Sequence, residues 1–101
     1  MALSLSQVLD AVEHQESGGN PHAVSSVGAR GNFQFMPRTW EEYGRGKSIN
    51  DPVASRDAAG RYLTDLYNKH GSVEAALAAY NGGDGGANFL MRNPHFIAHP
   101  D

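Results

Sequence analysis

Two acidic residues, an imidazole and a hydroxyl group lie close together near the beginning of the chain, in the segment Glu-His-Gln-Glu-Ser. They are Glu13, His14, Glu16 and Ser17. A carboxylic acid that stays protonated at about pH 6–7 can donate its proton to the oxygen of an acetal and so start the cleavage of a sugar chain. Which of these groups could do so depends on where the local helix places each side chain.

Helical periodicity separates these candidates. Apolar residues recur at the spacing i, i+3, i+4, i+7 and predict one buried stripe: Leu5, Val8, Leu9 and Val12. Four residues further on, the stripe reaches Glu16, whereas Glu13 and His14 fall off it and are expected to face solvent. Burial and the helix dipole in the last turn both predict a raised pKa for the Glu16 carboxyl. From spacing alone, a cap or an ion pair with arginine is an open alternative role for Glu16.

Capping signals predict where this first helix begins and ends. Ser4 and Gln7 have the S-x-x-Q spacing of a capping box. Gly18, Gly19 and Pro21 are expected to stop the helix directly after Glu16 and Ser17, because glycine adopts the left-handed cap and proline cannot continue a helix. The chain from 18 to 32 is expected to be a loop.

Three shorter signals predict further helices. Thr39 is expected to cap a short turn. Asp51 and Pro52 have the N-cap and first-position residue types of a helix that should end at Gly71, and Ser72 is expected to cap another short helix. No segment shows a convincing strand alternation, so we predict a small all-α fold.

The composition excludes several classes of protein. The 101 residues fit one domain over residues 1–101, and the net charge of −3 speaks against a nucleic-acid-binding module. The sequence has no cysteine and therefore neither disulfides nor thiolate metal sites. It has no apolar run long enough to span a membrane, and its beginning does not resemble a signal peptide.

Other candidate sites are weaker. His95 and His99 have the spacing of a helical metal pair, but they lie in a proline-flanked tail without a predicted helix. The glycine-rich segment 82–86 does not complete a phosphate-binding motif. Trp40 and Tyr43 are expected in the core or its rim, with contact to a sugar ring as the alternative. We predict no metal and no cofactor.

Several motifs follow one another in an order that resembles a known family. The first group consists of Glu16-Ser17, Asn20-Pro21 with Ala23, Gly28-Ala29, Gly31-Asn32-Phe33-Gln34 and Pro37-Arg38-Thr39. The second group consists of Asp51-Pro52 and Ala78-Ala79-Tyr80-Asn81-Gly82-Gly83. Over roughly residues 5–90, this ordered set resembles the soluble lytic transglycosylases, which share the lysozyme-like fold with goose-type lysozymes. The short chain suggests a small phage-type member.

The resemblance implies a fold, a substrate and a set of site residues. It implies a small lysozyme-like helical domain with a substrate groove, Glu16 as the catalytic acid/base, and peptidoglycan glycan strands as the substrate, without a cofactor. It also implies that Ser17, Gln34, Tyr80 and Asn81 line the saccharide groove.

The sequence departs from the family pattern at two points. The family segment Gly-Leu-Met-Gln reads Gly-Asn-Phe-Gln here, so Asn32 replaces an apolar residue and should either turn outward or face the substrate. Family members also usually carry a tyrosine, further along the chain, that helps to hold the catalytic glutamate, whereas this sequence has no tyrosine after Tyr80.

The number of available carboxylates bears on the reaction. Glycosidases ordinarily use two carboxylates, and goose-type lysozymes, in this resemblance, place helper aspartates in the loop after the glutamate helix. Residues 17–33 contain neither Asp nor Glu, which favours single-carboxylate chemistry and a 1,6-anhydromuramyl product. Asp51, Asp57 and Asp84 are the remaining candidates for a second carboxylate. Lysozyme-type hydrolysis and a non-catalytic glycan-binding module are the alternatives.

The expected place of action is the periplasm or the cell wall. Because no export signal is visible, we expect a phage enzyme that is part of a virion or is released during lysis, or a domain of a longer chain. Virion or secretion-machine components are therefore candidate partners besides peptidoglycan; neither nucleic acid nor a membrane span is expected.

Overall fold

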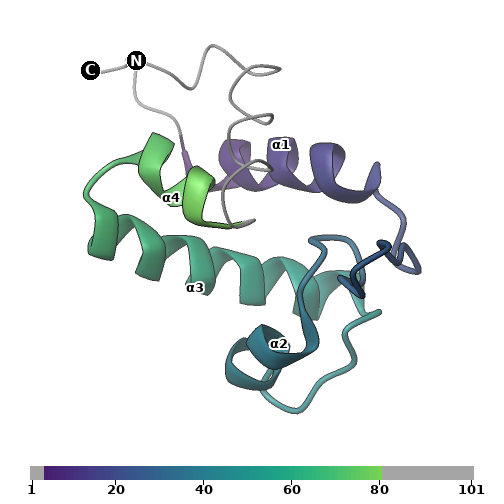
Figure 1. The fold of residues 1–101 in the computed structure, drawn as a ribbon. Coiled ribbons are helices and arrows are strands. Elements are labelled where there is room, and N and C mark those ends of the chain that lie inside the picture. Colours follow the sequence, from purple (N-terminus) through teal and green to yellow (C-terminus); the bar gives the residue numbers. More distant parts are fainter. Residues whose placement is uncertain (1–3, 81–101) are drawn as a thin grey trace.

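The computed structural model describes residues 4–80, which form four helices (Figure 1). They are α1 (Leu5–Ser17), α2 (Pro37–Tyr43), α3 (Pro52–His70) and α4 (Val73–Tyr80). Within residues 4–80 there is no extended strand, only two isolated antiparallel bridges, Val24 with Arg30 and Arg30 with Phe35. The predicted all-α class is confirmed for this part of the chain.

The ends of α1 lie where the capping signals predict them. The Ser4 hydroxyl accepts the Gln7 backbone N–H at 3.1 Å, and the Gln7 side chain accepts the Ser4 N–H at 2.9 Å. Gly18 ends the helix with φ of 64°, a left-handed conformation that glycine adopts without steric cost. The chain therefore turns away directly after Ser17.

Both ends of α3 and the start of α4 are confirmed in the same way. The Asp51 carboxylate accepts the backbone N–H groups of Val53 and Ala54, and Gly71 ends α3 with φ of 85°. The Ser72 hydroxyl accepts the Ala75 N–H at 3.1 Å at the start of α4.

The predicted start of α2 was wrong. Thr39 does not cap this helix, because it lies inside the first turn; Met36 is the N-cap and makes no capping bond through its side chain. The helix begins instead at Pro37, whose fixed φ suits the first helical position and which has no N–H to leave unsatisfied there.

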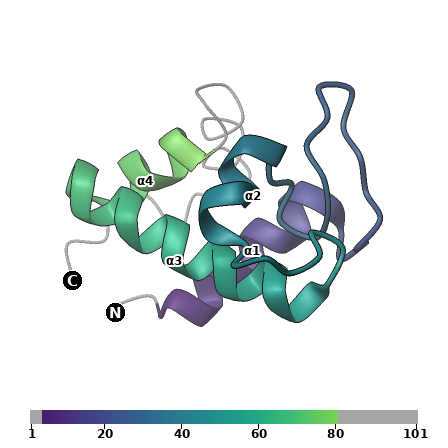
Figure 2. The ribbon, with the colours of Figure 1, turned by 90° about the horizontal axis from the view of Figure 1, so that it is seen from below.

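α3 is the central element and contacts each of the other three helices (Figures 1 and 2). A single core joins α1, α3 and α4 with two phenylalanines of the loop before α2. Its buried members are Val8, Leu9, Val12, Phe33, Phe35, Ala58, Ala59, Leu63, Leu77 and Tyr80. Among residues 4–80, no helix combines the length and apolar character needed to cross a membrane.

Candidate active site

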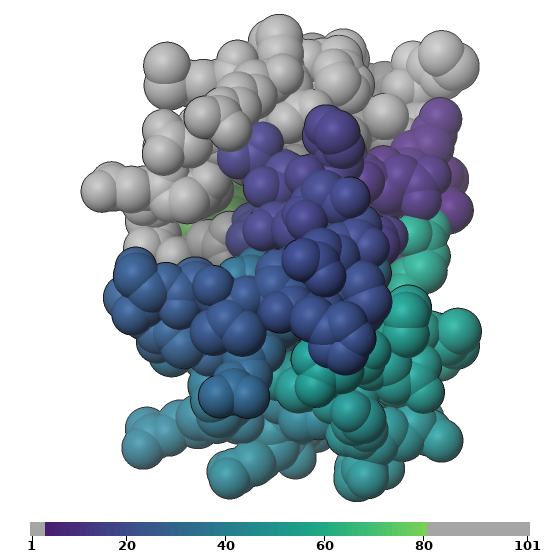
Figure 3. All heavy atoms as spheres, turned by 90° about the vertical axis from the view of Figure 1, so that its right-hand side faces the viewer, coloured from purple at the N-terminus to yellow at the C-terminus, as the bar shows by residue number. Residues whose placement is uncertain are grey.

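Glu16 lies in the last turn of α1 and is half-buried. The helix ends one residue later, so this carboxyl is positioned at the point where the chain leaves the core and enters the long loop. Figure 3 shows the end of α1 and the following loop next to each other on one face of the molecule.

Tyr80, the last residue of α4, is the aromatic residue of the candidate site. Its side chain is buried, and its hydroxyl donates a hydrogen bond to the Phe33 carbonyl oxygen at 2.9 Å. Burial raises the pKa of the Tyr80 hydroxyl well above its usual value, and the nearby charge of Glu16 raises it further. The fold therefore brings together the ends of two helices that are far apart in the sequence, with a neutral tyrosine close to the glutamate.

Ser17 holds the end of α1 to the loop. Its hydroxyl lies 2.7 Å from the Asn32 carbonyl oxygen and 3.3 Å from that of Glu13, and it accepts the Gly19 N–H at 3.0 Å. These contacts occupy the hydroxyl with backbone groups. Its predicted place in a saccharide groove stays a prediction.

Gln34 stabilises the same loop from within. Its side-chain amide donates to the carbonyl oxygens of Ala23 at 3.1 Å and Gly31 at 2.9 Å. Its backbone has φ of 53°, a left-handed conformation that is uncommon for residues other than glycine. The half-buried side chain thus helps to fix the loop that follows α1, and its contact with substrate also stays a prediction.

The prediction that Glu13 faces solvent was wrong. Its side chain is only 27% exposed, and its carboxylate accepts a hydrogen bond from the Asn32 side-chain amide at 2.8 Å. The loop after α1 folds back over this side of the helix, which the periodicity of the helix alone could not reveal. His14, by contrast, is exposed as predicted.

Asn32 was expected to turn outward or to face substrate, and it does neither. It is 3% exposed and points inward to Glu13. Sequence reasoning therefore missed the hydrogen-bonded pair of Glu13 and the buried Asn32, three residues before Glu16 on α1. The available signals were the polar residue at an apolar family position and an acid one helical turn before the glutamate.

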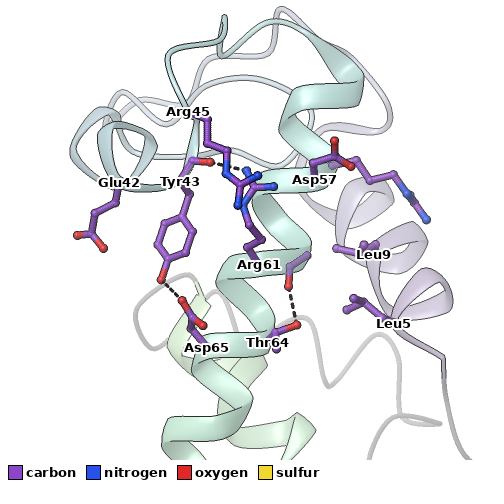
Figure 4. Close-up of a pocket in the computed structure, with 11 residues that line it drawn as sticks. Leu5, Leu9, Glu42, Tyr43, Arg45, Asp57, Arg61, Thr64 and Asp65 are labelled. Atoms are coloured by element: carbon purple, nitrogen blue, oxygen red, sulfur yellow. Dashed lines mark hydrogen bonds between the residues drawn. The ribbon is translucent and has the colours of Figure 1, made fainter.

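The other described carboxylate candidates, Asp51 and Asp57, and the aromatic candidates lie as follows. Asp51 caps α3 as predicted, and Asp57 lines a separate pocket of about 620 Å³ together with Leu5 and Leu9 from the first half of α1 (Figure 4). Trp40 and Tyr43 are partly buried against the core, as expected.

Four of the sequence predictions fall on residues outside the described range: Asn81, Asp84, the 82–86 segment, and the pair His95 and His99. Within residues 4–80, no group of three or more His, Asp or Glu side chains is placed to hold a metal ion. The assignment of residues 1–101 to one domain also stays a prediction.

Comparison with known proteins gives the family. The family described as the transglycosylase SLT domain matches residues 3–96. The chain belongs to this family. The resemblance seen in the ordered motifs is thereby confirmed.

Relatives with assigned names agree with this assignment. The chain is 35% identical over 83 residues to a transglycosylase of Enterobacteria phage PRD1, covering 82% of this chain and 31% of the relative. It is 36% identical over 86 residues to a membrane-bound lytic murein transglycosylase F of Stutzerimonas stutzeri, covering 78% of this chain and 18% of the relative. The chain thus spans about a third or less of the length of these relatives.

Solved structures place the fold in the same family. A 70 kDa soluble lytic transglycosylase in complex with bulgecin A superposes with a TM-score of 0.67 at 30% identity, over 88% of this chain and 16% of that one. The structure of the 70 kDa soluble lytic transglycosylase from Escherichia coli gives a TM-score of 0.62 at 28% identity, again over 88% of this chain and 16% of that one. The predicted lysozyme-like helical fold is confirmed.

Proposed function

We propose that this chain is the catalytic domain of a peptidoglycan lytic transglycosylase, which cleaves the β-1,4 bond between N-acetylmuramic acid and N-acetylglucosamine. The observation that carries the proposal is the half-buried Glu16 at the end of α1, near enough to the buried Tyr80 for its charge to raise the pKa of that hydroxyl, in a member of the transglycosylase SLT domain family. Glu16 is the only acid/base in this mechanism.

The reaction uses the same carboxyl group twice. Glu16 first donates its proton to the glycosidic oxygen, the bond from that oxygen to the muramyl C1 breaks, and the glucosamine leaves with a free hydroxyl. The Glu16 carboxylate then accepts the proton of the muramyl C6 hydroxyl while the C6 oxygen bonds to C1. The product is a 1,6-anhydro sugar, Glu16 is protonated again, and no water is consumed.

An internal nucleophile removes the need for a second carboxylate. Effective molarities of well-oriented intramolecular groups reach ~10⁵–10⁸ M. The loop after Glu16 has no acidic residue from 17 to 33, and the nearest acid on α1, Glu13, is hydrogen-bonded to Asn32 under that loop. Both observations support transglycosylation over two-carboxylate hydrolysis.

The test compares the released products. Purified sacculi are incubated with the protein, with Glu16→Gln and with Glu41→Gln, a control at an exposed glutamate of α2, and soluble muropeptides are analysed by mass. We expect anhydro ends from the protein and the control, and a rate lower by about 10²–10⁴-fold for Glu16→Gln, as for loss of a general acid. Reducing ends would instead indicate hydrolysis. If folded protein released nothing from sacculi, the chain would be a glycan-binding module at most.

We also propose that the chain acts at the bacterial cell wall as a phage enzyme, in a virion or during lysis. The support is its 35% identity to the transglycosylase of phage PRD1. Sequencing the genomic region around the coding gene tests this. We expect virion or lysis genes beside it, whereas an export signal in a bacterial gene would contradict the phage origin.

A further inference from the structure

Asn32 is a buried polar residue at a position where the family pattern is apolar. It is 3% exposed, and its side-chain oxygen has no hydrogen-bond partner among residues 4–80. A buried polar atom without a partner lowers stability. The residue is therefore poorly explained by packing alone, and its other contacts show what it does.

Those contacts are made with residues before and after Glu16 in the chain. The Asn32 carbonyl oxygen accepts the hydroxyl of Ser17, the next residue, at 2.7 Å. The Asn32 side-chain amide donates to the carboxylate of Glu13 at 2.8 Å and reaches the Gly19 carbonyl oxygen at 3.4 Å. Residues three apart in a helix are neighbours on its surface, so Asn32 holds the turn that carries Glu16 at its beginning and at its end.

The Glu13 end of this arrangement also faces α3. A Glu13 carboxylate oxygen lies 3.9 Å from a guanidinium nitrogen of Arg56 on α3. The Arg56 guanidinium pairs with Asp10 at 2.9 Å and donates to the Ser6 carbonyl oxygen at 3.1 Å. The last turn of α1 is thus connected through side chains to the central helix as well as to the loop.

We propose that Glu13 and Asn32 are positioning residues for Glu16, which rests on the function proposed above. Helix ends fray, and proton transfer requires the acid to lie within about 2.6–3.2 Å of the atom that it protonates. By fixing Glu13, Ser17 and Gly19 at once, Asn32 keeps the last turn of α1 formed and the Glu16 carboxyl at one place. Glu13 accepts a hydrogen bond in this role and does not act as a second acid/base.

Three variants separate a positioning role from chemical catalysis. Glu13→Gln keeps an oxygen that accepts the Asn32 hydrogen bond and removes the charge, Glu13→Ala removes both, and Asn32→Leu introduces the apolar family residue. The double variant Glu13→Ala/Asn32→Leu tests whether the two act as one unit. Glu41→Ala is the control at an exposed glutamate.

Kinetics on sacculi provide the first measurement. A displacement of ~1 Å at an active site lowers rates by ~10²-fold, so we expect kcat to fall by roughly 10- to 100-fold in Glu13→Ala and Asn32→Leu, with KM unchanged. The double variant should lose no more than the worse single variant, and Glu13→Gln should stay close to the unaltered protein. If Glu13→Gln lost as much as Glu13→Ala, the hydrogen bond from Asn32 to Glu13 would not be what positions Glu16, and the proposal would be wrong.

Amide hydrogen exchange provides a second measurement that needs no activity. We expect exchange in the last turn of α1, including the Gly18 amide that bonds to the His14 carbonyl oxygen at 3.1 Å, to accelerate roughly three- to tenfold in Glu13→Ala and Asn32→Leu. Exchange in the middle of α3 should change little. Equal acceleration in both helices, or none in α1, would contradict the proposal, whereas an inactive protein that still showed local acceleration would contradict only the proposed function.

Discussion

At the scale of single residues, Tyr80 links the core to the candidate site. Its ring lies in the core, 5.3 Å from the ring of Tyr62 and 6.2 Å from that of Phe35, while its hydroxyl bonds to the Phe33 carbonyl oxygen. A tyrosine hydroxyl is already protonated at neutral pH, and burial and the Glu16 charge both raise its pKa further here, so it remains a donor. The Tyr80 side chain is thus held both at its ring and at its hydroxyl.

Removing this hydroxyl should weaken the fold. We expect Tyr80→Phe to lower the free energy of unfolding by about 1–3 kcal/mol, because the Phe33 carbonyl oxygen loses its buried hydrogen bond. Urea unfolding measures the difference. The control Tyr67→Phe, at a side chain that is 48% exposed, should change stability by less than about 0.5 kcal/mol. Equal values for both variants would show that the Tyr80 bond contributes nothing to stability.

At the scale of elements, two hydrogen bonds tie α2 to α3 (Figure 4). The Tyr43 hydroxyl donates to the Asp65 carboxylate at 2.6 Å, and Arg61 donates to the Tyr43 carbonyl oxygen at 2.6 Å. The bond to Asp65, followed by burial, raises the pKa of Tyr43 from 10.0 to about 12. The short α2 has no buried residue of its own, so such contacts help to hold it in place.

This pKa shift predicts how stability depends on alkaline pH. In the unfolded chain Tyr43 ionises near pH 10.0, and in the folded protein only near pH 12. The stabilisation by Tyr43 is therefore fully present below pH 10 and is lost as the pH rises toward 12. We expect the difference in unfolding free energy between the protein and Tyr43→Phe to be constant up to pH 9 and to shrink above pH 10. A difference that stayed constant to pH 12 would contradict the Tyr43–Asp65 bond.

The elements also show what a sequence can and cannot reveal. Local signals located α1, α3 and α4, because capping residues such as Ser4 and Asp51 act on their own neighbours in the chain. The solvent-facing assignment of Glu13 failed because a loop from a later part of the chain covers that side of α1. Helical phase describes one helix by itself, whereas burial depends on everything that packs against it.

The candidate site also shows the difference between what local sequence signals predict and what depends on tertiary packing. The position of Glu16 at a helix end could be predicted from the apolar stripe and the following glycines. The family resemblance implied only that Tyr80 lines the saccharide groove. The effect of the Glu16 charge on Tyr80 could not come from periodicity, because it depends on how α1 and α4 pack across the core. For the Asn32–Glu13 pair, the polar residue at an apolar family position was a signal, but the partner could not be named without the course of the loop.

At the scale of the whole molecule, the core and the site share one segment of chain. Phe33 is fully buried between the helices, while its own carbonyl oxygen accepts the bond from Tyr80, and its neighbours Asn32 and Gln34 fix the loop beside Glu16. In a domain of this size a single core must serve both purposes. A substitution that disturbs core packing at Phe33 should therefore also lower the activity of the site.

The final prediction uses Phe33 to test this coupling. Phe33→Ala should lower the free energy of unfolding by about 3–5 kcal/mol through loss of buried area and a residual cavity, and the Tm by more than about 12 °C. Phe33→Met, the residue of the family pattern, should lose less than about 1.5 kcal/mol because it nearly conserves volume. Val27→Ala, at a side chain that is 73% exposed, serves as the control and should behave like the unaltered protein. Muropeptide release measured well below each Tm should fall for Phe33→Ala and persist for Phe33→Met. Only Phe33→Ala leaves a cavity next to the backbone carbonyl that accepts the Tyr80 hydrogen bond. Full activity in folded Phe33→Ala would show that the site is independent of this part of the core.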